Sequence, residues 1–254
     1  MRGERSERVS ILKWFIMGDK NCKNCGRLLQ PEDNYCPQCG QSAKTKRLQI
    51  KQVRKDVFKK FLHADSGILH LTKALAVRPG QAIGDYIAGK RKEYYEPLKY
   101  LTFTVGISVL LTTYFDLMLA NSADANPVSV FVAKHIDLIF LFSVPIAAAF
   151  SYLLFLRKGF NYAEHLALHA FLGGFRTVFF LLVFTPLVVF YRQHYSTILF
   201  VYFSMWIAYV AWANIQLMGG PKWLTILKTI AIMLLTQVVI SIFIFSVAIL
   251  YFRH

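Results

Sequence analysis

The sequence Cys-Lys-Asn-Cys-Gly at residues 22–26 is followed by Cys-Pro-Gln-Cys-Gly at residues 36–40, with ten residues between the two cysteine pairs. A tetrahedral zinc ion takes four thiolate sulfurs at about 2.3 Å. Each Cys-x-x-Cys turn can direct two sulfurs at one centre, and the glycine after it permits the positive φ that such a turn needs. The doubled spacing predicts a zinc ribbon over residues 21–43, with the ligands Cys22, Cys25, Cys36 and Cys39.

Other uses of the four cysteines fit the pattern less well. Disulfides would require an oxidising compartment, and a thioredoxin-type redox pair would require a neighbouring βαβ pattern, which the sequence lacks. Iron in the same four-sulfur cage stays open as an alternative metal. Because four protein ligands leave no open coordination position, we expect the zinc to be structural rather than catalytic.

The composition of the rest of the chain indicates a membrane protein. Of its 254 residues 56% are hydrophobic, and the charges are segregated. Residues 1–99 hold 21 of the 29 Lys and Arg and ten of the 14 Asp and Glu. A membrane-spanning helix needs about 20 mostly apolar residues. We predict an all-α polytopic bundle over residues 100–254, with five spans at about 100–119, 136–156, 166–191, 195–217 and 224–252.

The basic N-terminal third sets the expected orientation. Cytoplasmic segments carry the excess of Lys and Arg, so residues 1–99 are expected in the cytoplasm and the C-terminus outside. Reduced thiols that are ready for zinc agree with this side. Residues 1–20 form an N-terminal lead of uncertain role, and Met17 is an alternative to Met1 as the start of translation.

Residues 44–99 are expected to form short amphipathic helices at the membrane interface. Apolar residues recur at helical spacing from Ile50 to Phe61, and breaks are expected at residues 65–67 and 78–80. The basic side chains of this segment suit anionic lipid headgroups; they are Lys51, Arg54, Lys55, Lys59, Lys60, Lys90, Arg91 and Lys92. Nucleic-acid binding is the weaker interpretation, because the basic surface adjoins lipid and charge alone does not read sequence.

One helix in the bundle carries a polar face. Counting about 100° per residue places Asn161, Glu164, His165, His169 and Arg176 on one arc. Three interpretations stay open: an interfacial cluster satisfied by headgroups and neighbouring helices, a proton relay or ligand pocket, and a metal shared by the two histidines. We expect Arg176 to pair with Glu164, with another carboxylate or with a lipid phosphate. Elsewhere, Asn214 and Gln216 are expected to hydrogen-bond across helices.

Several motifs together resemble a known bacterial family. They are the two cysteine knuckles, Arg47-Leu48, Asp65-Ser66-Gly67, Thr72, Arg78-Pro79-Gly80, residues 85–91 (DYIAGKR), Tyr95-Glu96-Pro97 and residues 161–165 (NYAEH). This pattern is similar to the family catalogued as domain of unknown function 3667. The resemblance implies an N-terminal zinc ribbon, several membrane helices and the bacterial inner membrane, and it implies no activity.

These observations favour a non-enzymatic membrane protein whose cytoplasmic ribbon docks an unidentified protein partner in assembly or regulation. A closed metal site without a catalytic set of residues is the reason. The alternatives are a small transporter, a lipid-handling protein or a membrane enzyme, each of which would use the polar face from Asn161 to Arg176.

Overall fold

The computed structural model describes residues 21–50, 67–114 and 127–252. Within these residues the protein is helical except for the ribbon (residues 21–43), its connection to the bundle and the segments that join the helices, of which residues 89–96 are the longest. The N-terminal lead (residues 1–20) and most of the first basic helix expected from the sequence lie outside the described residues. Five predicted headgroup residues lie outside them too: Lys51, Arg54, Lys55, Lys59 and Lys60.

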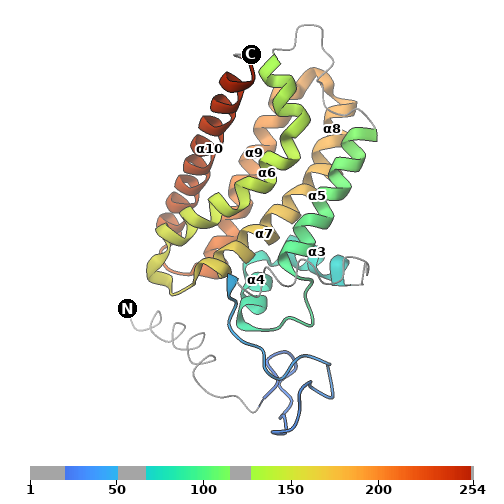
Figure 1. The fold of residues 1–254 in the computed structure, drawn as a ribbon, viewed down its shortest axis with the longest axis vertical. Coiled ribbons are helices and arrows are strands. Elements are labelled where there is room, and N and C mark those ends of the chain that lie inside the picture. Colours follow the sequence, from blue (N-terminus) through green and yellow to red (C-terminus); the bar gives the residue numbers. More distant parts are fainter. Residues whose placement is uncertain (1–20, 51–66, 115–126, 253–254) are drawn as a thin grey trace.

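Antiparallel helices form the bundle (Figure 1). They are α5 (Pro97–Tyr114), α6 (Pro127–Leu154), α7 (Tyr162–Phe179), α9 (Tyr195–Met218) and α10 (Lys222–Phe252). Helix α7 continues through a π-helical turn (Phe180–Phe184) into α8 (Thr185–Phe190). Short 3-10 turns, Leu156–Lys158 and Arg192–His194, connect α6 to α7 and α8 to α9. Helices thus occupy all five apolar runs, although α6 begins at Pro127, well before the predicted residue 136.

Among the residues that the structure describes, three helical segments are long and apolar enough to cross a membrane: Tyr162–Phe190, Tyr195–Met218 and Lys222–Ile249. The apolar parts of α5 and α6 that the structure describes are shorter, at Pro97–Leu111 and Leu138–Leu154. Helix α10 turns large apolar side chains outward along its length, with Leu234, Ile242 and Phe245 each more than half exposed. The chain therefore has the surface of a membrane protein, and the count of five spans stays a prediction.

Two short helices cover one end of the bundle. Helix α3 (Gly67–Val77) and helix α4 (Pro79–Ala88) lie between the bundle and the ribbon (Figure 1). Their buried side chains join those of α5, α7 and α9 in the main hydrophobic core. Within this core the rings of Tyr86 and Phe171 meet edge to face, with centroids 5.1 Å apart. The ribbon-side end of the bundle is thus closed by packed protein.

The break between α3 and α4 is held by side chains of α9. The hydroxyl of Tyr209 donates to the carbonyl of Leu75 near the end of α3 (3.0 Å), and the Gln216 side-chain oxygen accepts from the N–H of Gly80 (2.9 Å). This oxygen caps α4 in place of Arg78, whose side chain makes no capping bond. Gln216 and Asn214, which donates to Thr229 of α10, both bond across helices as expected.

Helix α4 packs closely against α9 at Gly80. A Cβ there would overlap the backbone oxygen of Ala213 and the Cβ of Gln216. We expect Gly80→Ala to lower the free energy of unfolding by about 1–3 kcal/mol, because the helices would have to separate. Thermal unfolding of the purified protein in detergent measures this.

Gly106→Ala is the matched control. A Cβ at Gly106 in α5 meets no atom within 4 Å, so this change should leave stability equal or higher, since alanine favours helix. Equal melting temperatures for Gly80→Ala and the parent would contradict the close packing of α4 on α9.

Candidate metal centre and its attachment to the bundle

Two knuckles of nearly the same geometry hold the cysteines. In the first, the N–H of Gly26 donates to the carbonyl of Cys22 at 2.8 Å, and in the second Gly40 donates to Cys36 at 2.8 Å. Both glycines have positive φ, 77° and 70°, as the sequence predicted. An isolated antiparallel bridge closes each knuckle. The backbone therefore presents two sulfurs from each turn to a common centre.

The four sulfurs form a compact cluster. Their Sγ atoms all lie within 4.8 Å of one another. The Sγ atoms of Cys22 and Cys39 are 3.5 Å apart, and those of Cys25 and Cys36 are 3.6 Å apart. A tetrahedron with metal–sulfur bonds of about 2.3 Å has edges of about 3.8 Å. All four are free thiols, so the cluster fits a tetrahedral metal ion such as zinc.

At one of the four cysteines, Cys36, the surroundings favour the thiolate that a metal requires. Burial raises the pKa of the Cys36 thiol, but hydrogen bonds from the backbone N–H groups of Cys39 and Gln38, together with those to the Cys25 and Cys39 side chains, outweigh it and lower this pKa to about 7. Metals bind the thiolate and not the thiol. The effect is confined to Cys36, because burial raises the pKa of the Cys39 thiol in the same knuckle to about 12.

Gln41, directly after the second knuckle, fastens the ribbon to the turn that follows α4. Its side chain is buried, and its Nε2 donates to the carbonyl of Gly89 at 2.8 Å. Its Oε1 accepts from the backbone N–H groups of Arg91 (3.0 Å) and Lys92 (3.1 Å). One amide thus makes three bonds, so the position of the knuckle and that of the turn are linked.

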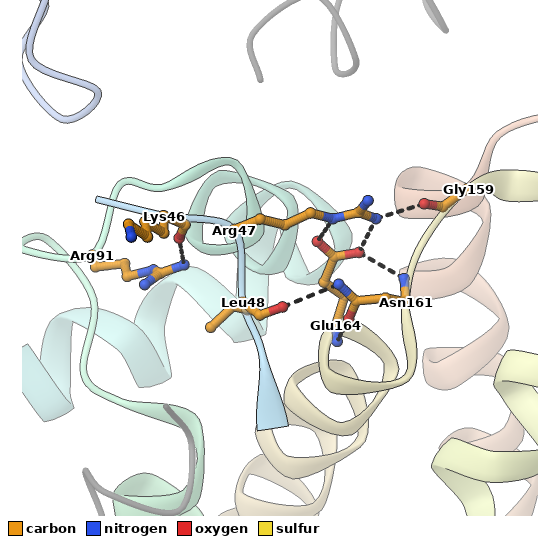
Figure 2. Close-up of polar contacts among 7 residues, drawn as sticks. All are labelled: Lys46, Arg47, Leu48, Arg91, Gly159, Asn161 and Glu164. Carbon is orange, nitrogen blue, oxygen red and sulfur yellow. Dashed lines mark hydrogen bonds and ion pairs between the residues drawn. The ribbon is translucent and has the colours of Figure 1, made fainter. Parts of the chain in front are cut away.

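Arg47 makes the second attachment, to the start of α7 (Figure 2). Its Nε and Nη2 atoms donate to the two carboxylate oxygens of Glu164, each at 2.7 Å, and Nη2 also donates to the carbonyl of Gly159 at 2.6 Å. Glu164 is only 1% exposed, whereas the Arg47 side chain is 38% exposed. The hydrogen bonds that Arg47 donates to Glu164 raise the pKa of Arg47. A buried carboxylate is thus matched by a bidentate guanidinium, the geometry in which Arg binds carboxylates best.

Asn161 completes this attachment. Its side-chain oxygen accepts from the N–H of Glu164 (3.0 Å), and its own N–H donates to the Glu164 carboxylate (2.8 Å), which makes a capping box at the start of α7. Its side-chain amide donates to the carbonyl of Leu48 at 3.0 Å (Figure 2). Leu48 itself is buried in the main core. The chain leaving the ribbon is therefore fixed by polar bonds and by apolar packing together.

The residues of the polar face predicted on α7 have different partners in the structure. Asn161 and Glu164 hold residues 47 and 48, as described above. Of the three partners expected for Arg176, Glu164 is excluded, because Arg47 and Asn161 occupy its carboxylate and Arg176 lies about 18 Å further along the helix. Arg176 instead donates to the hydroxyl of Tyr202 (3.3 Å), with its guanidinium 4.7 Å from the ring centroid of Phe140.

The two histidines of this face are buried in the bundle. His165 Nδ1 lies 2.9 Å from the hydroxyl of Ser151 on α6. The Nε2 atoms of His165 and His169 have no hydrogen-bond partner among the residues that the structure describes. The metal-compatible group found in that part of the chain consists of the four cysteines and includes neither histidine.

The turn after α4 (residues 89–92), called the basic turn here, bonds mainly to other parts of the protein. Lys90 forms an ion pair with Asp85 at 2.9 Å, and Arg91 donates to the carbonyl of Lys46 at 2.7 Å. Lys92 uses its backbone N–H for Gln41, while its side chain is exposed. Two of the three predicted headgroup residues in this turn therefore have protein partners.

Sequence reasoning assigned no role to Gln41, and Arg47 entered it only as part of the family resemblance. One signal for Glu164 was readable, because Asn161-x-x-Glu164 has the spacing of a capping box. Neither Arg47 nor Gln41 belongs to a motif with a known mechanism, and their partners lie 117 and 48 residues away. Only the fold brings these residues together.

Residues 65–109 match the family model described as "Protein of unknown function (DUF3667)". This segment covers α3, α4, the basic turn and most of α5, and it stops short of the cysteines. Neither a curated protein nor a solved structure matches the chain.

We expect purified protein to contain one zinc ion per chain at the four-cysteine cluster. Cys36→Ser should lose the metal and unfold the ribbon while the helices remain, because metal binding and folding of so small a unit are one event. Elemental analysis, helical circular dichroism and proteolysis within residues 21–43 measure the three effects. Asn34→Ser, at an exposed ribbon position, should keep the metal; full metal content in Cys36→Ser would contradict the assignment.

Arg47→Met should lower the free energy of unfolding by about 2–4 kcal/mol, because it leaves the Glu164 carboxylate buried without its cation. Adding Glu164→Gln should recover part of this loss, since the uncompensated charge is then removed. Thermal unfolding in detergent measures all variants. Lys46→Met, which changes an exposed neighbour, should unfold like the parent; the same result for Arg47→Met would show that the ion pair is unimportant.

Proposed function

For this member of a family without an assigned activity, we propose that the chain is an integral membrane protein that presents a zinc-stabilised ribbon to a protein partner in assembly or regulation. The observation that carries the proposal is the double attachment of the ribbon, by Gln41 and by the bond between Arg47 and Glu164. An ordinary flexible tether needs no such bonds. A small metal domain that is fixed at the end of the bundle presents its outer surface to a partner in one defined orientation.

The outer surface of the ribbon supports this role. Leu28 and Tyr35 are 66% and 67% exposed, one in each of the bridges that close the knuckles. Aromatic and large apolar side chains are the common anchors of protein interfaces. A metal bound by four cysteines has no open position, which favours a structural role for the ion.

The proposed setting is the bacterial inner membrane, with five spans, a cytoplasmic ribbon and an outer C-terminus. The alternating direction of α5, α6, α7, α9 and α10 supports an odd number of crossings (Figure 1). The positive charge of residues 1–99 supports a cytoplasmic location for the ribbon-side end. The described basic residues at this end, with anionic lipids as their partners, fit the same orientation.

A second candidate function is transport or lipid handling through the interior of the bundle. It rests on the two buried Nε2 atoms of His165 and His169, which lack partners in the described part of the chain. Polar groups inside membrane bundles often mark a pathway for protons or substrate. Enzymatic use of Glu164 has less support, because acid–base work would require its bonds to Arg47 and Asn161 to break.

The test removes the two exposed apolar side chains of the ribbon. Leu28→Ser with Tyr35→Ser should reduce co-purification of the partner at least tenfold in mild detergent, while zinc content and membrane insertion stay unchanged. Quantitative mass spectrometry of affinity-purified protein measures the loss. Gln30→Ala with Glu32→Ala, at exposed polar positions of the same ribbon, is the control that should keep the partner. An identical set of captured proteins from all variants would contradict partner docking by this surface.

A further inference from the structure

Helix α10 carries two polar side chains on its outer face. It lies at the edge of the bundle (Figure 1) and packs against α6 and α9 through buried residues such as Thr225, Thr229 and Ile232. Gln237 and Ser241, one helical turn apart, are exposed on the other side of the helix. The residues that the structure describes therefore leave this polar pair uncovered.

The polar pair lies deep in an apolar segment. This segment of α10 runs from Lys222 to Ile249, which places Gln237 about 22 Å from one end and about 18 Å from the other at a rise of about 1.5 Å per residue. Residues 229–252 contain no charged residue. Because the hydrocarbon core of a bilayer is about 30 Å thick, Gln237 is expected among the acyl chains rather than the headgroups.

The amide of Gln237 is poorly satisfied by its own chain. Its Nε2 donates one long hydrogen bond, 3.4 Å, to the hydroxyl of Ser241, and this is the bond that the side chain makes to described residues. A glutamine amide can donate twice and accept twice. Acyl chains offer no hydrogen bonds, so an amide that faces them without a partner costs free energy. A second helix that supplies both a donor and an acceptor would therefore be stabilised on this face.

Gln237 and Ser241 continue a regular row of exposed side chains along α10. The positions of the row are separated alternately by four and three residues, which is the spacing at which two helices pack with a left-handed twist. The row, called the outer seam here, consists of Trp223, Leu227, Ile230, Leu234, Gln237 and Ser241, all exposed. In paired helices a polar residue at one such position fixes the register. The outer seam thus has the pattern of a surface that packs against another helix.

Symmetry favours a second copy of this chain as the occupant of the outer seam. Two copies of a membrane protein share one orientation, so a two-fold axis between them runs along the membrane normal, and identical residues meet at the same depth. Glutamine suits this arrangement because its amide both donates and accepts. We propose that two copies form a dimer through the outer seams of their α10 helices, with Gln237 bonded to Gln237 of the partner subunit. The proposal requires that the bundle is in a membrane and does not depend on partner docking by the ribbon.

The test measures how strongly the full-length protein associates with itself. Sedimentation equilibrium of the purified protein in a density-matched mild detergent gives the dissociation constant of the dimer. Gln237→Leu should raise this constant about tenfold, because hydrogen bonds between membrane helices contribute on that scale. Gln237→Asn, which keeps an amide, should stay closer to the parent. A parent protein that is monomeric at every concentration, or an unchanged constant in Gln237→Leu, would overturn the proposal.

A matched pair of truncations tests the position of the interface. Leu234 belongs to the outer seam and is 62% exposed, whereas Leu235 is 40% exposed and lies about 100° further around the helix. Leu234→Ala should raise the dissociation constant about fivefold, and Leu235→Ala about twofold at most. Equal effects would overturn the proposal, as would a different membrane protein that co-purifies with the parent and is lost in Gln237→Leu. Helical circular dichroism, expected to equal that of the parent, verifies that the variants fold.

Discussion

The bidentate bond between Arg47 and Glu164 is the constraint on which the arrangement of the two parts depends. Glu164 is almost fully buried at the start of α7, where a lone carboxylate would be costly. Its cation comes from the chain that leaves the ribbon, so the buried carboxylate is paired with Arg47 only while that chain is in place. Asn161 bonds to the same segment at the carbonyl of Leu48, and it also caps α7. The helix start and the docking of the ribbon are therefore one polar network.

The metal centre and this network act on the same short segment from opposite ends. Gln41 follows the last cysteine by two residues and bonds to the turn after α4, and Arg47 bonds to α7 six residues later. A metal that orders the second knuckle also orders Gln41. Because α3 and α4 are fixed in turn by Tyr209 and Gln216 of α9, the metal domain is connected to the bundle through side chains of several helices.

Local sequence patterns predicted local structural features well, but they did not predict contacts between residues far apart in the chain. The cysteine spacing predicted the cluster, and Arg78-Pro79-Gly80 predicted the break between α3 and α4, since backbone chemistry fixes both. Periodicity placed Glu164 and Arg176 on one face of a helix but could not give their partners. Arg47 and Tyr202 come from distant segments, and pairing across 117 residues leaves no trace in one sequence. Apolar composition likewise located five helices but did not establish how many cross the membrane.

A distance measurement between the ribbon and the bundle tests the central claim most directly. Spin labels introduced through noncanonical amino acids at Glu32 and Leu156, both exposed, leave the four cysteines free for metal. Pulsed electron paramagnetic resonance on the metal-loaded protein should give one narrow distribution of the distance between the two labels, and Arg47→Met should broaden this distribution. A broad distribution in the parent protein would contradict the account, because it would mean that the ribbon moves independently of the helices.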